Sequence, residues 1–293
     1  MKNTMPSIRT ISCLDSPEMA ASCRQDLDIP LNRAAELGRS AVDATTRGYY
    51  VNGYGDKVDW SKAVARARSL KQSIPPDVTL QISRSTHLPD TRVRICNNTT
   101  LQAACRLIEE GLKPLALNFA NGICPGGGFL RGARAQEEVL CRSSPLYSTL
   151  VDDPMYEYHR NRQEPDSSDW VIYSPDVPVF RSDIGTELDE PWILSFLTSA
   201  APYASSIGQP ESGDLLQKRI HRILAVAAAY GYEALVLGAW GCGAFGNDPY
   251  RTALDFRSAL EGEFAGHFSD VVFAVTDWSP ERRFLGPFKS VFS

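Results

Sequence analysis

Apolar residues follow two spacings along the chain, and over residues 91–293 the two alternate. Continuous apolar runs such as YEALVLGAW at 232–240 are typical of buried strands, whereas apolar positions three or four residues apart, as at 213–230, predict amphipathic helices. Pro175 and Pro178 interrupt one apolar run, so that strand is expected to lie at a sheet edge or to carry a bulge. Strands are expected at 92–97, 113–121, 170–180, 232–240 and 270–278, with a further short apolar segment at 193–201, and helices at 100–112, 136–150, 213–230 and 251–264. Alternating strands and helices predict an α/β fold with a largely parallel or mixed central sheet.

The first 90 residues show a different pattern. Helical spacing occurs at 31–47 and 60–71. The segment 79–85 has the composition of a strand, and residues 1–26 look irregular. We therefore expect a mainly helical N-terminal accessory region at 1–90 and a core domain at 91–293.

The bulk composition limits the kinds of partner. The chain has 293 residues, of which 43% are hydrophobic, so it can form a substantial core. Its 30 basic and 35 acidic residues leave a formal net charge of −5. A protein that binds nucleic acid regardless of sequence is expected to carry a basic excess. An anionic substrate would therefore have to be held by local geometry, and no direct sequence-specific binding of nucleic acid is expected.

The seven cysteines are an odd number and include no CxxC pair, which favours reduced thiols over a disulfide framework or a zinc site. The four histidines show no metal-ligand spacing, so we expect neither a metal nor a cofactor. Residues 1–20 lack the apolar stretch of a secretory signal, and the apolar run at 223–230 is far too short to span a bilayer. These features favour a soluble protein in the cytoplasm, or in the nucleus if the source is eukaryotic.

The segment GGGFLRGARAQEE at 126–138 carries the most specific chemical signal. Three consecutive glycines let the backbone adopt positive φ and approach a ligand with no Cβ in the way. After seven intervening residues, at the predicted start of a helix, come Gln136, Glu137 and Glu138. A phosphate-binding loop beside two carboxylates suits a sugar–phosphate substrate whose glycosidic bond is broken by proton transfer.

A second glycine-rich segment, GAWGCGAFGNDP at 238–249, follows a predicted buried strand and precedes a predicted helix. Backbone N–H groups at such a junction attract phosphate, so we interpret the segment as a diphosphate-binding loop, with a tight structural turn as the alternative. It contains GxGxxG, but a Rossmann site would also want an acidic residue about 20 positions on, and the next strand ends only at Asp277. Phe245 can lie against a ribose or base, or pack in the core. We interpret Cys242 as a small residue that fills the loop and not as a nucleophile, since no histidine is near it in sequence.

Glu137 and Glu138 are neighbours at a helix start, where adjacent side chains point roughly 100° apart. They cannot easily flank one bond from opposite faces, as the paired carboxylates of ordinary glycosidases do. We therefore expect divided roles, with one glutamate as general acid/base and the other holding a ribose hydroxyl. The alternative is an acidic pair that favours the helix dipole and faces solvent. Arg131 and Arg134, between the two motifs, are equally compatible with phosphate contact and with plain loop positions.

These motifs resemble those of a known family. The three glycines, seven intervening residues and QEE resemble the signature of the poly(ADP-ribose) glycohydrolases, and 241–249 looks like the diphosphate loop of the bacterial-type members. The segment NFAN at 118–121 resembles the distal-ribose loop of macrodomains. The resemblance covers about residues 90–290, and residues 1–90 look like the helical N-terminal extension of the bacterial type. It implies a macrodomain-like three-layer α/β/α fold with a mixed central sheet.

The resemblance also implies an activity: hydrolysis of ribose–ribose O-glycosidic bonds in poly(ADP-ribose), from chain ends, with release of ADP-ribose. Poly(ADP-ribose) or an ADP-ribosylated protein would be the partner, and reversal of ADP-ribosylation in the DNA damage response the biological role. Glu138 would be the catalytic acid/base, and Glu137 would hold the ribose hydroxyls. Thr276 and Asp277 follow the last strand, where the edge of a base could sit. The residues implied in substrate binding are Asn121, Gly126, Gly127, Gly128, Gln136, Gly241, Cys242, Gly243, Ala244 and Phe245.

Two other functions would use the same pocket. An ADP-ribose-binding macrodomain without turnover needs the glycine loops but not the glutamate pair, so the QEE motif favours an enzyme. A mono-ADP-ribosyl hydrolase would use the same residues, and the sequence does not separate it from an enzyme that cleaves the polymer. Chain-end or internal cleavage depends on whether a loop caps the pocket, which motif spacing does not decide.

Overall fold

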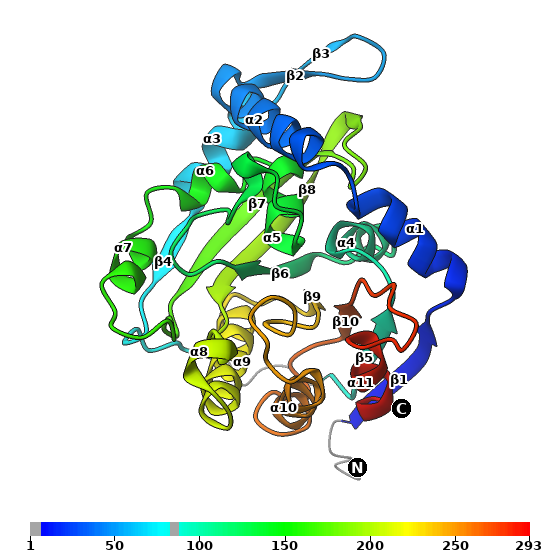
Figure 1. Ribbon diagram of the computed structural model, residues 1–293, viewed down its shortest axis with the longest axis vertical. Helices are drawn as coiled ribbons and strands as arrows, with labels where there is room; N and C mark the ends of the chain where they lie inside the picture. Colours follow the sequence, from blue (N-terminus) through cyan, green and yellow to red (C-terminus); the bar gives the residue numbers. More distant parts are fainter. Residues whose placement is uncertain (1–6, 83–87) are drawn as a thin grey trace.

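The computed structural model describes residues 7–82 and 88–293, and a large mixed sheet runs through it (Figure 1). The strand order is β1-β5-β10-β9-β6-β8-β7-β4; every neighbouring pair from β1 to β8 is parallel, and β7 is antiparallel to both β8 and β4. The strands of this sheet are β1 (Ser7–Leu14), β4 (Gln72–Ile74), β5 (Asp90–Cys96), β6 (Pro114–Ala120), β7 (Val171–Arg181), β8 (Glu187–Ala200), β9 (Ala234–Leu237) and β10 (Asp270–Ala274). A separate hairpin pairs β2 (Tyr49–Val51) with β3 (Lys57–Asp59).

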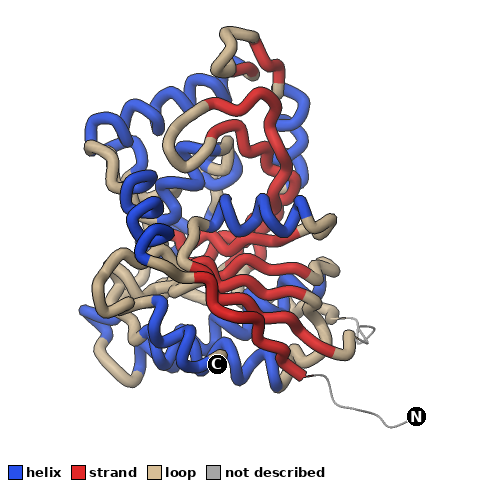
Figure 2. Tube along the Cα trace, turned by 90° about the vertical axis from the view of Figure 1, so that its right-hand side faces the viewer, coloured by secondary structure: helices blue, strands red, loops and turns tan. Residues whose placement is uncertain are grey.

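Helices cover both faces of the sheet (Figure 2). They are α1 (Pro17–Leu27), α2 (Leu31–Arg47), α3 (Ser61–Leu70), α4 (Thr100–Glu109), α5 (Gln136–Ser143), α6 (Tyr147–Leu150), α7 (Pro154–Arg160), α8 (Ala204–Ile207), α9 (Glu211–Ala229), α10 (Pro249–Glu261) and α11 (Leu285–Val291), with a short 3₁₀ helix η1 (Phe129–Arg131). Within the part of the chain that the structure describes, no helix is long and apolar enough to cross a membrane.

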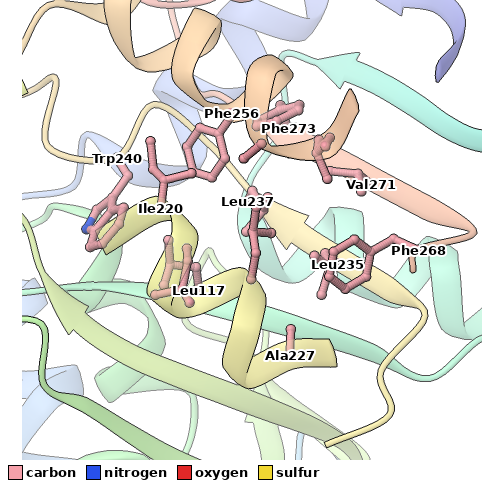
Figure 3. Close-up of a cluster of buried hydrophobic side chains, with 14 of the residues drawn as sticks. Leu117, Ile220, Ala227, Leu235, Leu237, Trp240, Phe256, Phe268, Val271 and Phe273 are labelled. Atoms are coloured by element: carbon pink, nitrogen blue, oxygen red, sulfur yellow. The ribbon is translucent and has the colours of Figure 1, made fainter. Parts of the chain in front are cut away.

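Two hydrophobic clusters lie on opposite faces of the parallel strands. Val271 and Phe273 of β10 join the cluster beneath α9, α10 and α11, while Val272 and Ala274 join the cluster that includes α4 and α5. Figure 3 shows part of the first cluster, with Trp240 at one end. Alternate residues of each strand thus serve opposite layers, which is why the parallel strands read as continuous apolar runs. The α/β prediction with a mixed central sheet is confirmed.

The bulge predicted in 170–180 is present. The pairing of β7 with β8 shifts register between Ser174 and Val177, beside Pro175. On the other side, β4 pairs only with residues 171–173 of β7, so neither proline faces a backbone acceptor of β4. Proline lacks the N–H that a continuous ladder requires, and both features remove that requirement.

Three sequence predictions are wrong. Residues 7–26 are not irregular, because β1 pairs along β5 and α1 follows it, and residues 1–6 lie outside the described residues. The alternating burial of this edge strand leaves no continuous apolar run to detect. The helix predicted at 136–150 is broken, with Ser144 in an extended conformation (φ −152°, ψ 167°) before Pro145, which disfavours helical geometry in its predecessor. The strand predicted at 79–85 is not formed at 79–82, and its remaining residues lie outside the described residues.

The N-terminal region supports the glycine-rich segment of the core. Helix α2 packs on α5 and η1, and a Cβ added to Gly38 of α2 would lie 2.7 Å from the carbonyl oxygen of Phe129. Strands β1 and β4 belong to the same sheet as the strands beyond residue 90. The division into two parts at residue 90 stays a prediction, but both parts contribute to one sheet.

Candidate active site

The two glycine-rich segments lie at one edge of the sheet. Strand β6 ends at Ala120 and runs into the first segment, strand β9 ends at Leu237 and runs into the second, and the two strands are parallel neighbours. The carboxyl ends of parallel strands meet at the same edge, and such edges are common ligand sites in α/β folds. A cavity of about 310 Å³ opens there, lined by Gln136 and by Gly241, Gly243, Ala244 and Phe245 among others, whereas the glycine triplet and the two glutamates do not line it.

Glu137 lies in the first turn of α5 and is only 3% exposed. Its Oε2 accepts a hydrogen bond from the backbone N–H of Asn121 at 2.7 Å, and its Oε1 accepts from Nδ2 of Asn118 at 3.4 Å. Burial, opposed by these hydrogen bonds and assisted by the charge of Glu138, raises the pKa of Glu137 to about 8. The carboxyl group is therefore dry and fully held by β6 and the residue that follows it.

Glu138 is also buried, at 7% exposure, but it is held on one side only. Its Oε1 accepts from the N–H of Gly128 at 2.9 Å, while its Oε2 has no hydrogen-bond partner among the described residues. The interpretation of the two glutamates as a solvent-facing pair is therefore wrong. The protein donates hydrogen bonds to both oxygens of Glu137 but to only one oxygen of Glu138.

The glycine triplet wraps the two carboxylates. Gly126 and Gly127 have positive φ, at 69° and 59°. A Cβ added to Gly127 would overlap Oε1 of Glu138 and lie 3.1 Å from Oε2 of Glu137. The N–H of Gly128 is bonded to Glu138, and that of Gly127 to the carbonyl of Cys124. We expected these glycines to hold a diphosphate, but in this structure those two N–H groups hold protein acceptors.

The second segment leaves its donors free. The backbone N–H groups of Gly243, Ala244 and Phe245 donate to no atom of the residues that the structure describes. The side chain of Asn247 keeps the loop in shape, because its Nδ2 donates to Pro202 at 2.9 Å and to Gly241 at 3.1 Å, both to carbonyl oxygens. Free N–H groups beside a cavity form an anion-binding surface.

The side chains of this loop divide between cavity and core. Phe245 lines the cavity and lies edge-on to Tyr203, with ring centroids 5.6 Å apart. Cys242 does not line the cavity; its Sγ lies 3.5 Å from Oγ1 of Thr252, and burial raises the pKa of the thiol to about 12. A thiol with so high a pKa is a poor nucleophile, so the side chain of Cys242 fills space in the loop.

Two other predicted binding residues have their side chains engaged within the protein. Gln136 lines the cavity, yet its Oε1 accepts from the N–H of Phe119 at 2.9 Å and its Nε2 donates to the carbonyl of Leu117 at 2.7 Å. Asn121 uses its Oδ1 to accept from the N–H groups of residues 123 and 124. Gln136 thus fastens α5 to β6, and Asn121 shapes the turn that begins the glycine segment.

Of the remaining candidate residues, Thr276 and Arg134 line the cavity and Asp277 does not. Thr276 lines the cavity, whereas the carboxylate of Asp277 is taken up by Ser279 and by the N–H groups of Phe284 and Leu285. Asp277 therefore organises the last loop and has no oxygen left for a base. Arg134 lines the cavity and also pairs with Asp28 at 2.6 Å.

Residues that the sequence analysis did not single out complete the site. Asp183, in the turn between β7 and β8, lines the cavity and is 5% exposed. Arg142 lies four residues after Glu138 on α5 and is 1% exposed. A charge four residues from a candidate glutamate on one predicted helix was the available signal for Arg142. No local signal marks Asp183.

The burial of Glu137 predicts a particular dependence of stability on pH. The carboxyl group ionises near 4.5 in the unfolded chain but only near 8 in the folded protein, so the folded state binds more protons between these values. The free energy of unfolding should therefore fall as the pH rises from 4.5 to 8, by at most about 1.4 kcal/mol per pH unit. Glu137→Gln should show a flatter dependence in urea unfolding. Glu36→Gln, at an exposed glutamate of α2, should keep the wild-type slope, and equal slopes for all three proteins would contradict the burial argument.

The family description "Microbial-type PARG, catalytic domain", where PARG is poly(ADP-ribose) glycohydrolase, matches residues 38–182. The crystal structure of poly(ADP-ribose) glycohydrolase from Thermomonospora curvata is 41% identical, with a TM-score of 0.84 over 89% of this chain and 99% of that chain. The glycohydrolase from Deinococcus radiodurans in complex with ADP-ribose is 39% identical, with a TM-score of 0.71 over 78% of this chain and 96% of that chain. No curated protein sequence matches.

A structure of the Thermomonospora curvata enzyme bound to the inhibitor ADP-HPD is also similar, at 41% identity and a TM-score of 0.81 over 88% of this chain and 99% of that chain. The fold and these similarities thus define a glycosidase with a macrodomain-like α/β fold. The chain belongs to the microbial-type poly(ADP-ribose) glycohydrolases, which hydrolyse poly(ADP-ribose). The resemblance stated from the glycine and QEE motifs is confirmed.

Proposed function

We propose that this chain removes ADP-ribose units from the ends of poly(ADP-ribose), with Glu138 as the general acid/base. The observation that carries the proposal is the buried Oε2 of Glu138, which has no partner among the described residues although its Oε1 is fixed by Gly128. A general acid needs one oxygen with no partner in the protein and a frame that keeps it in place. Oε2 meets the first condition but is fully buried here, so the proposal requires the substrate to gain access to it on binding. Glu137 accepts one hydrogen bond at each oxygen, which leaves acceptor capacity for the supporting role of holding ribose hydroxyls.

The proposed reaction has two steps. Protonated Glu138 donates its proton to the leaving 2′-oxygen while the bond from that oxygen to the anomeric carbon breaks, and the bonding electron pair stays with the oxygen. The oxocarbenium ion that forms is attacked by water, whose proton passes to the Glu138 carboxylate and restores the acid. The products are a polymer shortened by one unit and free ADP-ribose.

The second glycine-rich segment is proposed to hold the diphosphate. The free N–H groups of Gly243, Ala244 and Phe245 beside the cavity support this role. The cavity volume of about 310 Å³ lies at the lower end of the range for small-molecule sites, roughly 300–1,000 Å³. A site of that size suits one terminal unit better than an internal stretch of polymer, which supports cleavage from chain ends.

Product analysis tests this proposal against its alternatives. With purified poly(ADP-ribose), free ADP-ribose should be the only small product from the earliest times, and the average chain length should fall gradually. A protein that carries single ADP-ribose units should stay modified under the same conditions. Early appearance of short oligomers would indicate internal cleavage instead, and rapid release from the singly modified protein would indicate a mono-ADP-ribosyl hydrolase. Absence of any product, with ADP-ribose still bound, would reduce the chain to a binding module.

We further infer that the protein acts in the cytoplasm on ADP-ribosylated proteins. All seven cysteines are free thiols, which suits a reducing compartment. An ADP-ribosylated protein would supply the polymer as its attached chain. A role in the DNA damage response follows only if such substrates arise from damage-dependent polymer synthesis in the host cell.

A further inference from the structure

The segment 121–128, which joins β6 to the glycine triplet, supplies a backbone donor to each of the two glutamates. At its start, the N–H of Asn121 donates to Oε2 of Glu137 at 2.7 Å. At its end, the N–H of Gly128 donates to Oε1 of Glu138 at 2.9 Å. The position of this segment therefore sets where both carboxyl groups lie.

Helix α7 holds the segment from outside through two consecutive side chains. Nδ1 of His159 lies 2.9 Å from the carbonyl oxygen of Gly122. Nη1 of Arg160 donates to the carbonyl oxygen of Ile123 at 2.9 Å. In the part of the chain that the structure describes, neither carbonyl accepts from any other group. Two neighbouring residues of α7 thus engage two successive carbonyls of segment 121–128.

The partners of His159 determine which ring nitrogen carries the proton. A carbonyl oxygen can only accept, so Nδ1 donates to Gly122. Burial lowers the pKa of His159 to about 4, so the ring is neutral at neutral pH, and Nε2 accepts from Oγ of Ser168 at 2.6 Å. The side chain is only 4% exposed, and both nitrogens are engaged within the protein. His159 therefore has no nitrogen left for a substrate and acts only on the backbone that it holds.

Segment 121–128 packs closely against this support. A Cβ added to Gly122 would overlap Oγ of Ser167, and it would lie 3.2 Å from Cβ of Ala200 and 3.3 Å from Nδ1 of His159. A side chain at this position would therefore push the backbone away from α7. With glycine there, the hydrogen bond from His159 acts on the backbone at close range.

We propose that His159 and Arg160 are positioning residues, which hold segment 121–128 where its N–H groups orient Glu137 and Glu138. This inference rests on the roles proposed above for the two glutamates. A misplacement of about 1 Å at a catalytic centre can cost about 10²-fold in rate. Loss of the hydrogen bond from His159 should therefore lower kcat for poly(ADP-ribose).

Binding of ADP-ribose should change much less than kcat. The free N–H groups proposed to hold the diphosphate belong to residues 243–245, in the second glycine-rich segment. Neither His159 nor Arg160 lines the cavity. The expected result is therefore a loss of kcat with a nearly unchanged Kd for ADP-ribose, measured by titration calorimetry.

Two substitutions of His159 separate positioning from general support of the fold. The side-chain nitrogen of asparagine is the same number of bonds from Cα as Nδ1 of histidine, so His159→Asn keeps a donor for Gly122. The nitrogen of glutamine corresponds instead to Nε2, so His159→Gln loses that donor. His159→Gln should lower kcat by about 10-fold to 10²-fold, whereas His159→Asn should stay close to the wild-type rate. The measurement is release of ADP-ribose from purified polymer, at temperatures where circular dichroism shows each variant to be folded.

His221→Gln is the matched control for the loss of a histidine hydrogen bond. Nδ1 of His221 lies 2.8 Å from Oε2 of Glu263, but the residue belongs to α9 and does not line the cavity. This variant should keep the wild-type kcat. Arg160→Met keeps the test decisive if His159→Gln folds poorly, because Arg160 is exposed. It should lower kcat by up to about 10-fold, since the contact from His159 remains.

Three results would each overturn the proposal: wild-type kcat in a folded His159→Gln, equal losses of kcat in His159→Gln and His159→Asn, or wild-type kcat in Arg160→Met. The proposed function has a separate test. If Glu138→Gln were fully active, the proposed function itself would fail. If Glu138→Gln were inactive while His159→Gln and Arg160→Met kept the wild-type kcat, only this inference would fail.

Discussion

Replacing Glu138 by glutamine is expected to reduce the kcat of poly(ADP-ribose) hydrolysis by roughly 10²–10⁴-fold, the range that general acid–base catalysis supplies. A glutamine oxygen can still accept the hydrogen bond from Gly128, which spans 2.9 Å in the wild type. What the variant loses is the acidic proton that we assign to Oε2, the oxygen without a partner among the described residues. The measurement is release of ADP-ribose from purified polymer under single-turnover conditions.

A binding measurement and the matched variant Glu137→Gln show whether the loss of activity in Glu138→Gln is specific to its acidic proton. Glu138→Gln should bind ADP-ribose nearly as tightly as the wild type by titration calorimetry, because the free N–H groups of residues 243–245 are unchanged. Glu137→Gln should lower kcat less, because Glu137 acts as an acceptor at both oxygens and glutamine keeps one of them. A near wild-type rate for Glu138→Gln would remove Glu138 from its role, and a larger loss in Glu137→Gln would reverse the two assignments.

Adding one methyl group at Gly127 is expected to reduce kcat/KM about 10²-fold, the cost of a misplacement of about 1 Å at a catalytic centre. The new Cβ in Gly127→Ala would overlap Oε1 of Glu138 and lie 3.1 Å from Oε2 of Glu137, so both carboxyl groups must shift or the loop must move. The backbone at Gly127 also has φ 59°, which an alanine adopts only with strain. The rate loss is measured with the same polymer assay.

Gly111→Ala is the control for the strain alone. Gly111 has φ 84°, and a Cβ there would meet nothing within 4 Å, so the substitution carries a similar backbone cost without touching a carboxylate. It should destabilise the protein by about 1–2 kcal/mol and leave kcat/KM unchanged. Equal kcat/KM for the two variants would show that the glycine triplet does not hold the glutamates in place.

The elements with the clearest apolar patterns were predictable because burial on both faces of a parallel sheet leaves a local record. Strand β9 within 232–240 is an example. Helix α2 at Leu31–Arg47 was predictable because the residues of its buried face recur at helical spacing. Edge strand β1 left no such record, because it alternates between exposed and half-buried residues and its pairing with β5 joins distant parts of the chain. Local periodicity reports burial, and it fails where an element is only half covered.

In the candidate site, too, some features were predictable from the sequence and others were not. The spacing of the glycine triplet and Gln136-Glu137-Glu138 indicated that loop and carboxylates work together, and their contacts agree. The direction of those contacts was not predictable: the N–H of Gly128 turned out to hold a glutamate, while the unengaged donors lie in the second glycine-rich segment. Which N–H groups are left free depends on where each side chain folds back, and composition does not record that.

The sequence by itself determined the layered α/β fold and the family, and it marked the two glutamates as candidate site residues, because these depend on periodicity and on motifs of fixed spacing. Only the tertiary structure showed how the two glutamates differ in hydrogen bonding, with Glu137 held at both oxygens and Glu138 at one. It also brought Asp183, from the turn after β7, to the cavity beside α5. The physical reason is that burial and hydrogen-bond occupancy arise from contacts between segments far apart in the chain, and these contacts set the chemistry of a carboxyl group.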